Sequence, residues 1–227
     1  MTEPIDEPGP TEWTAAPVGV GPHARPWPTD DRYDPELLAA GDTRNVVDRY
    51  RYWRRAAIVA DLDERRHPLH VAIENFAYDA NIGTVVRTAN AFAAREVHIV
   101  GRKRWNRRGA MVTDRYQHLR HHPDVASLIG AAGDLGLTVV AVDNLSGSVP
   151  IETTALPRNC LLLFGGESAG LSDGARDGAA VTVSIAQFGS TRSINVGVAA
   201  GIAMHAWIRQ HADLTTAWSS GPDDQAG

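Results

Sequence analysis

The chain has 227 residues, of which 43% are hydrophobic, and that is enough to bury one sizeable core. Its single cysteine, Cys160, cannot form an internal disulfide, which excludes the disulfide-stapled scaffolds of small secreted proteins. The net charge of −5 conceals a basic middle, because residues 44–122 carry fifteen arginines and one lysine against eight acidic residues. Phosphate contacts depend on local charge, so this distribution fits a nucleic-acid partner, although a solvated, salt-bridged face explains the composition equally well.

Targeting and membrane signals are not recognisable in the sequence. It begins MTEPIDEPGP, which is acidic and rich in proline, whereas a signal peptide begins with positive charge followed by an apolar run. No apolar stretch reaches the roughly 18 residues that a membrane span needs. We therefore expect a cytoplasmic protein that has no membrane partner.

The first segment, residues 1–31, is rich in proline, glycine and acidic residues, and this composition predicts a disordered tail. Residues 32–66 follow as a basic helical extension. Within it, Thr43 is a candidate helix cap, and apolar and aromatic side chains recur at roughly helical spacing over 43–62. The sequence thus predicts one arginine-rich amphipathic helix there, suited to packing on a core or to gripping RNA.

Beyond residue 66 the pattern alternates between strand and helix. Helices are expected over 81–94 and 193–212. Buried strands rich in Val, Ile and Leu are expected at residues 69–76, 96–101, 137–144, 159–166 and 180–185. This alternation predicts an α/β fold, with a parallel sheet and flanking helices. We assign this domain to residues 67–213 and expect 214–227 to be a disordered tail.

Polar residues and glycines gather at three strand ends, where parallel sheets bind ligands. The first group is NIGTVVRTAN at 81–90, in which Asn81 is placed to cap the helix. Arg87 lies among apolar residues, with Gly83 and Ala91 rather than carboxylates four residues away. Taken alone, Arg87 is most simply explained as a snorkelling arginine on a partly buried helix.

The second group is LLLFGGESAGLS at 161–172, a buried strand that runs into a glycine turn around Glu167. The same turn matches G-x-S-x-G, the nucleophile elbow of α/β serine hydrolases, with Ser168 as the nucleophile. Two features weaken that alternative. No HGGG-type oxyanion segment precedes the turn, and the candidate histidines, His205 and His211, fall in or near the terminal helix.

The third group is the polar loop that follows the strand at 180–185 and the helix start around Ser193 and Asn195. A helix start offers free backbone N–H groups, and the small residues that follow let another backbone pack closely.

These three groups together resemble the SpoU (TrmH-like) branch of the SPOUT methyltransferases, over about residues 69–212. The resemblance rests on N-x-G-x-x-x-R-x-A at 81–89, L-x-F-G-x-E-x-x-G-L at 162–171 and S-x-N-V at 193–196, in this order. It implies that the C-terminal part of the sheet domain is threaded into a deep trefoil knot. It also implies a homodimer, with the active site near the subunit interface.

The resemblance implies an activity: transfer of a methyl group from S-adenosyl-L-methionine to a ribose 2′-hydroxyl in structured RNA, either tRNA or rRNA. The catalytic residues that carry over by motif are Asn81, Arg87, Glu167, Ser193 and Asn195. The residues that it places at the cofactor are Asp143, Asn144, Leu145, Phe164, Gly165, Gly166, Glu167, Ile185, Gln187, Phe188, Ser193, Asn195 and Val196. The matching arginine is assigned as the base in this family; because a guanidinium keeps its charge, the alternative role for Arg87 is to bind the adjacent phosphate and stabilise the developing oxyanion.

Two departures from the family pattern stand out. The third motif usually has a proline and a methionine after its isoleucine, whereas this chain has Ala186 and Gln187. We also expect no separate N-terminal RNA-binding domain, only the acidic tail and the basic extension.

A run of five cations with Trp105 follows the strand at 96–101 directly and suits phosphate contact and base stacking. The residues expected to contact RNA are Arg51, Arg54, Arg55, Arg102, Lys103, Arg104, Trp105, Arg107, Arg108, Arg115 and Arg120. No metal site is expected, because His118, His121 and His122 have no nearby cluster of carboxylates or thiolates in the sequence. A non-catalytic RNA-binding protein remains the main alternative to the methyltransferase.

Overall fold

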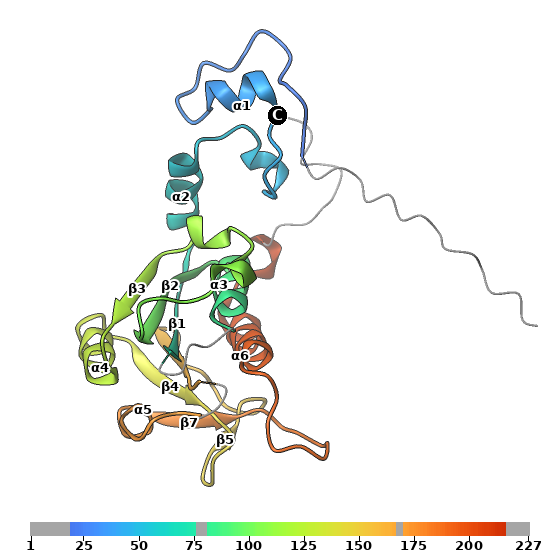
Figure 1. Cartoon of the computed structure of the whole chain (residues 1–227). Coiled ribbons are helices and arrows are strands. Elements are labelled where there is room, and N and C mark those ends of the chain that lie inside the picture. The colour runs from blue at the N-terminus through green and yellow to red at the C-terminus, as the bar shows by residue number, and fades with distance from the viewer. Residues whose placement is uncertain (1–18, 76–80, 167–169, 217–227) are drawn as a thin grey trace, which may run out of the picture. The chain divides into compact units, whose positions relative to one another are not determined.

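The computed structural model describes residues 19–75, 81–166 and 170–216. The chain divides after Ile58 into two compact units. The smaller unit contains α1 (Pro35–Ala40), the short 3-10 helix η1 (Asp48–Tyr50) and the first residues of α2 (Arg55–Asp63). The larger unit contains the sheet and the remaining helices (Figure 1).

The buried carboxylate of Asp42 organises the smaller unit. It accepts hydrogen bonds from the Arg44 guanidinium, at 2.6 and 2.8 Å, and from the Tyr52 backbone N–H at 2.9 Å. Val20 and Asp42 exchange two backbone hydrogen bonds of 2.9 Å, so residues 19–31, predicted as part of a disordered tail, make defined contacts; residues 1–18 lie outside the described residues.

The single helix predicted over 43–62 is wrong. The chain forms only η1 and then α2, because it wraps around Asp42 and turns through a positive φ of 64° at Tyr52. Tyr50 lies in η1 and Trp53 precedes α2, and the two buried rings contact each other with their centroids 5.4 Å apart.

The larger unit is built on one sheet with the strand order β3-β2-β1-β6-β4-β7-β5, and every neighbouring pair is parallel. Its strands are β1 (His67–Asn75), β2 (Ala94–Gly101), β3 (Leu119–His122), β4 (Thr138–Val142), β5 (Val149–Pro150), β6 (Cys160–Phe164) and β7 (Val181–Ser184). The predicted parallel α/β fold is confirmed. The sequence did not predict β3 and β5, which are short and largely exposed edge strands.

Helices cover both faces of the sheet. On one face α3 (Ile82–Ala91) and α6 (Val196–His211) pack against inward side chains such as Val71 and Ile73. On the other, α4 (Val125–Asp134) and α5 (Asp173–Asp177) pack near Ala72. Burial on both faces explains why β6 is apolar at every position, as central parallel strands are.

Cys160 lies in β6 and is fully buried, which raises the pKa of its thiol to about 12. It is a free thiol and fills the core, as predicted. Within the described residues, no helix has the length and apolar character needed to cross a membrane.

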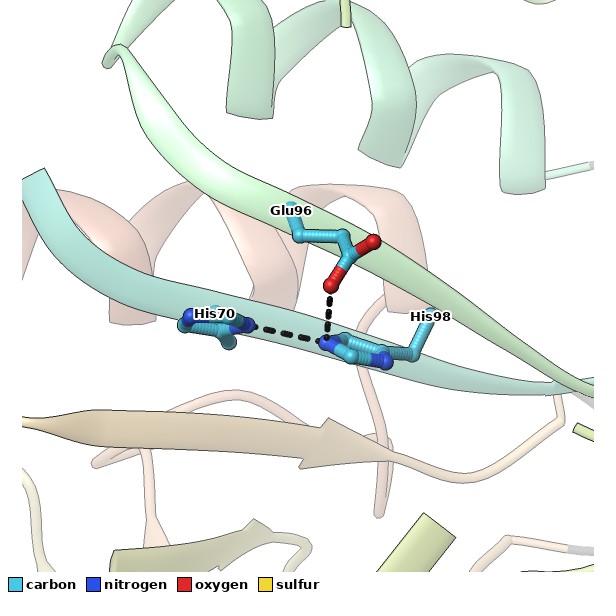
Figure 2. A group of neighbouring side chains, drawn as sticks. All are labelled: His70, Glu96 and His98. Atoms are coloured by element: carbon cyan, nitrogen blue, oxygen red, sulfur yellow. Dashed lines mark hydrogen bonds and ion pairs between the residues drawn. The ribbon is translucent and has the colours of Figure 1, made fainter. Parts of the chain in front are cut away.

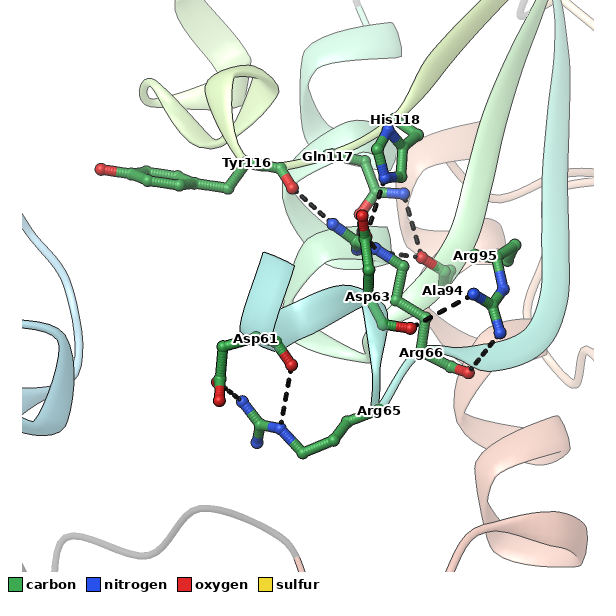
Figure 3. A network of polar contacts seen from close by, with 9 residues as sticks. All are labelled: Asp61, Asp63, Arg65, Arg66, Ala94, Arg95, Tyr116, Gln117 and His118. Carbon is green, nitrogen blue, oxygen red and sulfur yellow. Dashed lines mark hydrogen bonds and ion pairs between the residues drawn. The ribbon is translucent and has the colours of Figure 1, made fainter. Parts of the chain in front are cut away.

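Arg66 fastens the end of α2 to the sheet. Its buried guanidinium donates hydrogen bonds to Asp63 Oδ1 at 2.6 Å, to Gln117 Oε1 at 3.1 Å and to the Tyr116 carbonyl at 2.6 Å (Figure 3). A buried charge is tolerated only when it is paired and hydrogen-bonded, and these partners satisfy that condition. The Arg66 side chain therefore stabilises the fold.

Candidate active site

A pocket of about 290 Å³ lies where the carboxyl ends of β4 and β6 meet the start of α6. Parallel sheets bind ligands at this edge because successive strand ends and helix starts converge there. The residues that line it are Val142, Asp143, Asn144, Phe164, Gly165, Gly166, Gly170, Ile185, Gln187, Arg192, Ser193, Ile194, Asn195, Val196 and Ala199.

Asn195 joins the first and third motifs at this pocket. Its Oδ1 accepts hydrogen bonds from the backbone N–H groups of Gly197 (2.9 Å) and Val198 (3.2 Å), which caps α6. Its Nδ2 donates to Asn81 Oδ1 at 2.9 Å. Asn81 does precede α3, as predicted, but its side chain makes no capping hydrogen bond there. One amide thus fixes two helix starts that lie 114 residues apart in sequence.

Asp143 and Asn144 connect the second and third motifs. Asp143 Oδ2 accepts from the Leu171 backbone N–H at 3.2 Å, and Asn144 Nδ2 donates to the Arg192 carbonyl at 3.1 Å. A Cβ at Gly165 would lie 2.0 Å from the carbonyl carbon of Gly170, so only glycine fits where the turn closes on itself. The two ends of the turn are thereby held at the pocket.

The loop after β7 carries the departure from the family pattern. The Ala186 backbone N–H donates to Glu152 Oε1 at 2.9 Å, a bond that a proline at this position could not make. Glu152 therefore tethers the loop where the family usually has a rigid residue. The side-chain oxygen Oε1 of the neighbouring Gln187 is buried and receives no hydrogen bond from the described residues.

Arg87 lies about 9 Å further along α3 than Asn81, and its side chain is exposed. It does not line the pocket, and it makes no hydrogen bond or ion pair within the described part of the chain. Its helix is held closely on two sides: a Cβ at Gly83 would lie 2.7 Å from Gly109 Cα, and one at Gly197 would lie 3.1 Å from Thr84 Cγ2.

Because Gly83 contacts Gly109, the 3-10 helix η2 (Arg107–Ala110), which contains the end of the basic segment 102–108, lies beside α3. Asn75, at the buried end of β1, donates from Nδ2 to the carbonyls of Arg102 (2.7 Å) and Arg104 (3.0 Å). These bonds fix the backbone of the segment while its cationic side chains remain exposed. Trp105 packs partly against the core, and the Arg107 guanidinium lies 5.5 Å from the centre of its ring.

The remaining residues expected at RNA are distributed differently. Arg51, Arg54 and Arg55 belong to the smaller unit, where Arg51 donates to the Arg44 carbonyl at 2.6 Å. In the larger unit, the exposed Arg120 pairs with Glu96 at 3.0 Å. Arg115 is exposed.

The pocket lining includes ten of the thirteen residues expected at the cofactor: Asp143, Asn144, Phe164, Gly165, Gly166, Ile185, Gln187, Ser193, Asn195 and Val196. Leu145 does not line it, Phe188 is 98% exposed, and Glu167 lies outside the described residues, as does Ser168 of the hydrolase alternative.

Sequence reasoning missed Glu152, Asn75 and Glu74. Buried Glu74 accepts from the Ser172 backbone N–H at 2.9 Å and so holds the start of α5. Glu74 and Asn75 end the first predicted strand, and polar residues at that position were a usable signal. Nothing in the sequence relates Glu152 to Ala186.

Comparisons with known proteins agree with this geometry. A family model described as the SpoU rRNA Methylase family matches residues 68–205. A tRNA (guanosine(18)-2'-O)-methyltransferase from Thermus thermophilus is 28% identical over 165 residues, which cover 69% of this chain and 82% of that protein.

Two solved structures share the architecture. An AdoMet-bound rRNA methyltransferase from Sinorhizobium meliloti is 26% identical with a TM-score of 0.57, covering 67% of this chain and 61% of the other. The TrmH/SpoU tRNA modifying enzyme of A. aeolicus has the same fold, with a TM-score of 0.61 at 22% identity, covering 69% of this chain and 82% of that one.

Proposed function

Because the chain belongs to the SpoU rRNA methylase family, and is thus an S-adenosylmethionine-dependent methyltransferase of a ribose 2′-hydroxyl in RNA, we propose that methyl transfer takes place at the pocket beside Asn195. The observation that carries this proposal is the Asn195–Asn81 hydrogen bond, because it brings the first and third motifs together at the edge of the pocket. We propose tRNA or rRNA as the substrate.

The pocket suits the cofactor. Gln187 presents a buried acceptor that receives no hydrogen bond from the part of the chain that the structure describes, and adenosylmethionine carries amino groups that can supply a donor. The glycine turn at 165–166 brings backbone groups to the lining, as expected for a cofactor held largely by main-chain contacts. When bound, the cofactor supplies an electrophilic methyl group on a positively charged sulfur.

We assign the chain's own residues as follows. Arg87 binds the phosphate beside the target ribose and stabilises the negative charge that develops on the 2′-oxygen. Asn81 and Asn195 fix the start of α3 relative to the pocket, and so position Arg87. Ser193 shapes the ribose side of the pocket, and Glu167 is proposed to act with it.

The basic segment 102–108 is proposed to bind the RNA backbone. Its end in η2 lies beside α3, its cations are exposed, and Trp105 offers a ring for stacking. An RNA lying across this segment would meet Arg87 on the adjacent helix.

We also propose a homodimer that forms through α6. Val198 and Ile202 lie four residues apart on α6, Ile194 precedes the helix by two residues, and each of the three exposes more than a third of its surface. Phe188, in the neighbouring loop, is almost fully exposed. An apolar row of this kind beside a pocket is typical of a subunit interface. Cytoplasmic location and the trefoil knot stay predictions.

Labelled-methyl transfer to RNA in an Arg87→Ala variant tests the proposed function. Loss of one charge-stabilising group is expected to lower the rate by about 100-fold or more. Cofactor affinity, measured by calorimetry, should not change, because Arg87 does not line the pocket. Arg176→Ala, on α5, is the matched control and should keep its activity.

If the Arg87→Ala variant transferred methyl groups at the unmodified rate, Arg87 would not be part of the active site. RNA binding by the unmodified chain without any cofactor binding would favour the non-catalytic alternative.

A further inference from the structure

Two histidines and a glutamate converge near the amino ends of β1 and β2, away from the pocket described above. Glu96 and His98 are two residues apart on β2, so their side chains point to the same face, and His70 lies opposite Glu96 on β1. His70 Nδ1 lies 2.9 Å from His98 Nε2, and Glu96 Oε2 lies 3.7 Å from the same nitrogen (Figure 2).

These donor atoms have the spacing of a metal site. All three lie within 4.8 Å of one another. Tetrahedral zinc ligands at about 2.0–2.1 Å from the ion stand about 3.3 Å apart, and the two distances given above bracket that value. Two imidazoles and one carboxylate form a ligand set that zinc uses when it keeps a fourth position open.

The facing nitrogens of the two buried histidines, His70 Nδ1 and His98 Nε2, are the atoms that would hold the ion. In the tautomer that binds a metal, His98 keeps its proton on Nδ1 and His70 carries its proton on Nε2, which leaves lone pairs on the two facing nitrogens.

Outer partners hold two of the three ligands in place. His98 Nδ1 lies 2.8 Å from Nε2 of the buried His122 on β3, and Arg120 donates to Glu96 Oε1 at 3.0 Å. Hydrogen bonds of this kind fix the orientation of a ligating imidazole and of a ligating carboxylate. Glu96 therefore turns its other oxygen, Oε2, toward His98.

An entry path is also present. A cavity of about 490 Å³ is lined by His70 and Glu96 and bounded by Leu135 and Leu137. The nearby charges of Arg95 and Arg120, which also lower the pKa of His70, oppose a cation there. We therefore expect weaker binding than at a dedicated structural zinc site.

We propose that His70, Glu96 and His98 form a zinc site that joins β1 to β2 and leaves one coordination position open toward the cavity. The site is independent of the methyl-transfer pocket, which lies at the opposite, carboxyl edge of the sheet.

Cobalt(II) provides the direct test, because it replaces zinc and its visible absorption reports tetrahedral coordination. The full chain, without a histidine tag and treated with chelator, is titrated with Co²⁺ and then with Zn²⁺. One equivalent of cobalt per chain should produce the absorption, and zinc should abolish it. Zinc should also raise the melting temperature of the chain, because it binds only the folded state.

Variants locate the site. His70→Gln and Glu96→Gln should lose the tetrahedral absorption, and His122→Gln should weaken cobalt binding by about tenfold through its contact with His98. His121→Gln is the matched control: it is exposed on the same strand as His122 and should bind cobalt as the unmodified chain does. The proposal is overturned if the folded chain gives no such absorption, or if the absorption persists in the His70→Gln, Glu96→Gln double variant. Because Glu96 is only partly buried, Glu96→Gln keeps the test decisive should a histidine variant fail to fold.

Discussion

Asn195 donates a hydrogen bond from Nδ2 to Oδ1 of Asn81 at 2.9 Å, while its own Oδ1 caps α6. The two halves of this amide have separable roles. The oxygen stabilises a helix start, and the nitrogen fixes the start of a second helix, the one that carries Arg87.

Asn195→Asp should therefore separate stability from activity. Aspartate caps a helix as well as asparagine does, so the free energy of unfolding should stay within about 0.5 kcal/mol of the unmodified value. The donor to Asn81 is lost, and the displaced α3 should lower the methyl-transfer rate at least about tenfold. Urea denaturation and a transfer assay measure the two effects.

The comparison variant is Asn195→Ala, which loses both roles and should also cost about 1 kcal/mol of stability. An Asn195→Asp chain that is as active as the unmodified chain would show that the bond to Asn81 does not position the site.

Gly83→Ala should destabilise the packing of α3 on η2, which contains the end of the basic segment. The added Cβ would lie 2.7 Å from the backbone atoms Gly109 Cα and Ala110 N, and backbone cannot move aside cheaply. We expect a loss of about 1–3 kcal/mol, measured by urea denaturation. Gly130→Ala in α4 is the control, because no atom of the described residues lies within 4 Å of its added Cβ and alanine favours helix. Equal stability of the two variants would contradict the close approach.

Glu152→Ala should weaken cofactor binding, because it releases the Ala186 N–H and frees the loop that carries Gln187. A lost hydrogen bond of about 1 kcal/mol corresponds to about a fivefold increase in Kd. Glu152→Gln keeps an acceptor oxygen and should bind nearly normally. Calorimetric titration with adenosylmethionine gives the dissociation constants of both variants. Unchanged affinity in Glu152→Ala would show that the Glu152–Ala186 hydrogen bond does not hold the cofactor loop.

Arg108→Ala should reduce the salt dependence of RNA binding. Each phosphate contact removed lowers the slope of log affinity against log salt by about 1 unit. Arg108 is exposed in the basic segment, whereas Arg176 on α5 is exposed elsewhere, and Arg176→Ala should leave the slope unchanged. Filter binding over a range of salt concentrations measures this. A slope that is unaffected in Arg108→Ala would place the RNA away from the segment.

Val198→Asp should convert the proposed dimer into a monomer. The side chain is 54% exposed on α6, so a charge there is tolerated in the folded chain but not in an apolar interface. Light scattering after gel filtration reports the mass, and methyl transfer should fall with it. Leu135→Asp changes an exposed apolar residue at the end of α4 and should leave the mass unchanged. A monomeric unmodified chain would refute the interface.

Local patterns were enough to predict much of the candidate site. The strand end at Gly165 and the helix start at Asn195 were expected at one edge of the sheet, because parallel strands place their carboxyl ends together, whereas Asp143 was expected there only from the family resemblance; all three line the pocket. The pattern failed over 43–62, where the chain turns through a positive φ at Tyr52, whose backbone N–H donates to the buried carboxylate of Asp42.

The sequence by itself determined the strands β1, β2, β4, β6 and β7 and the helices α3 and α6 of the sheet domain, because burial on one or two faces imposes a periodicity on neighbouring residues. Only the tertiary structure decided that Asn81 meets Asn195, that Glu152 holds Ala186, and that His70 faces His98. Such contacts join residues far apart in the chain. They depend on which strands become neighbours, and no local periodicity records that order.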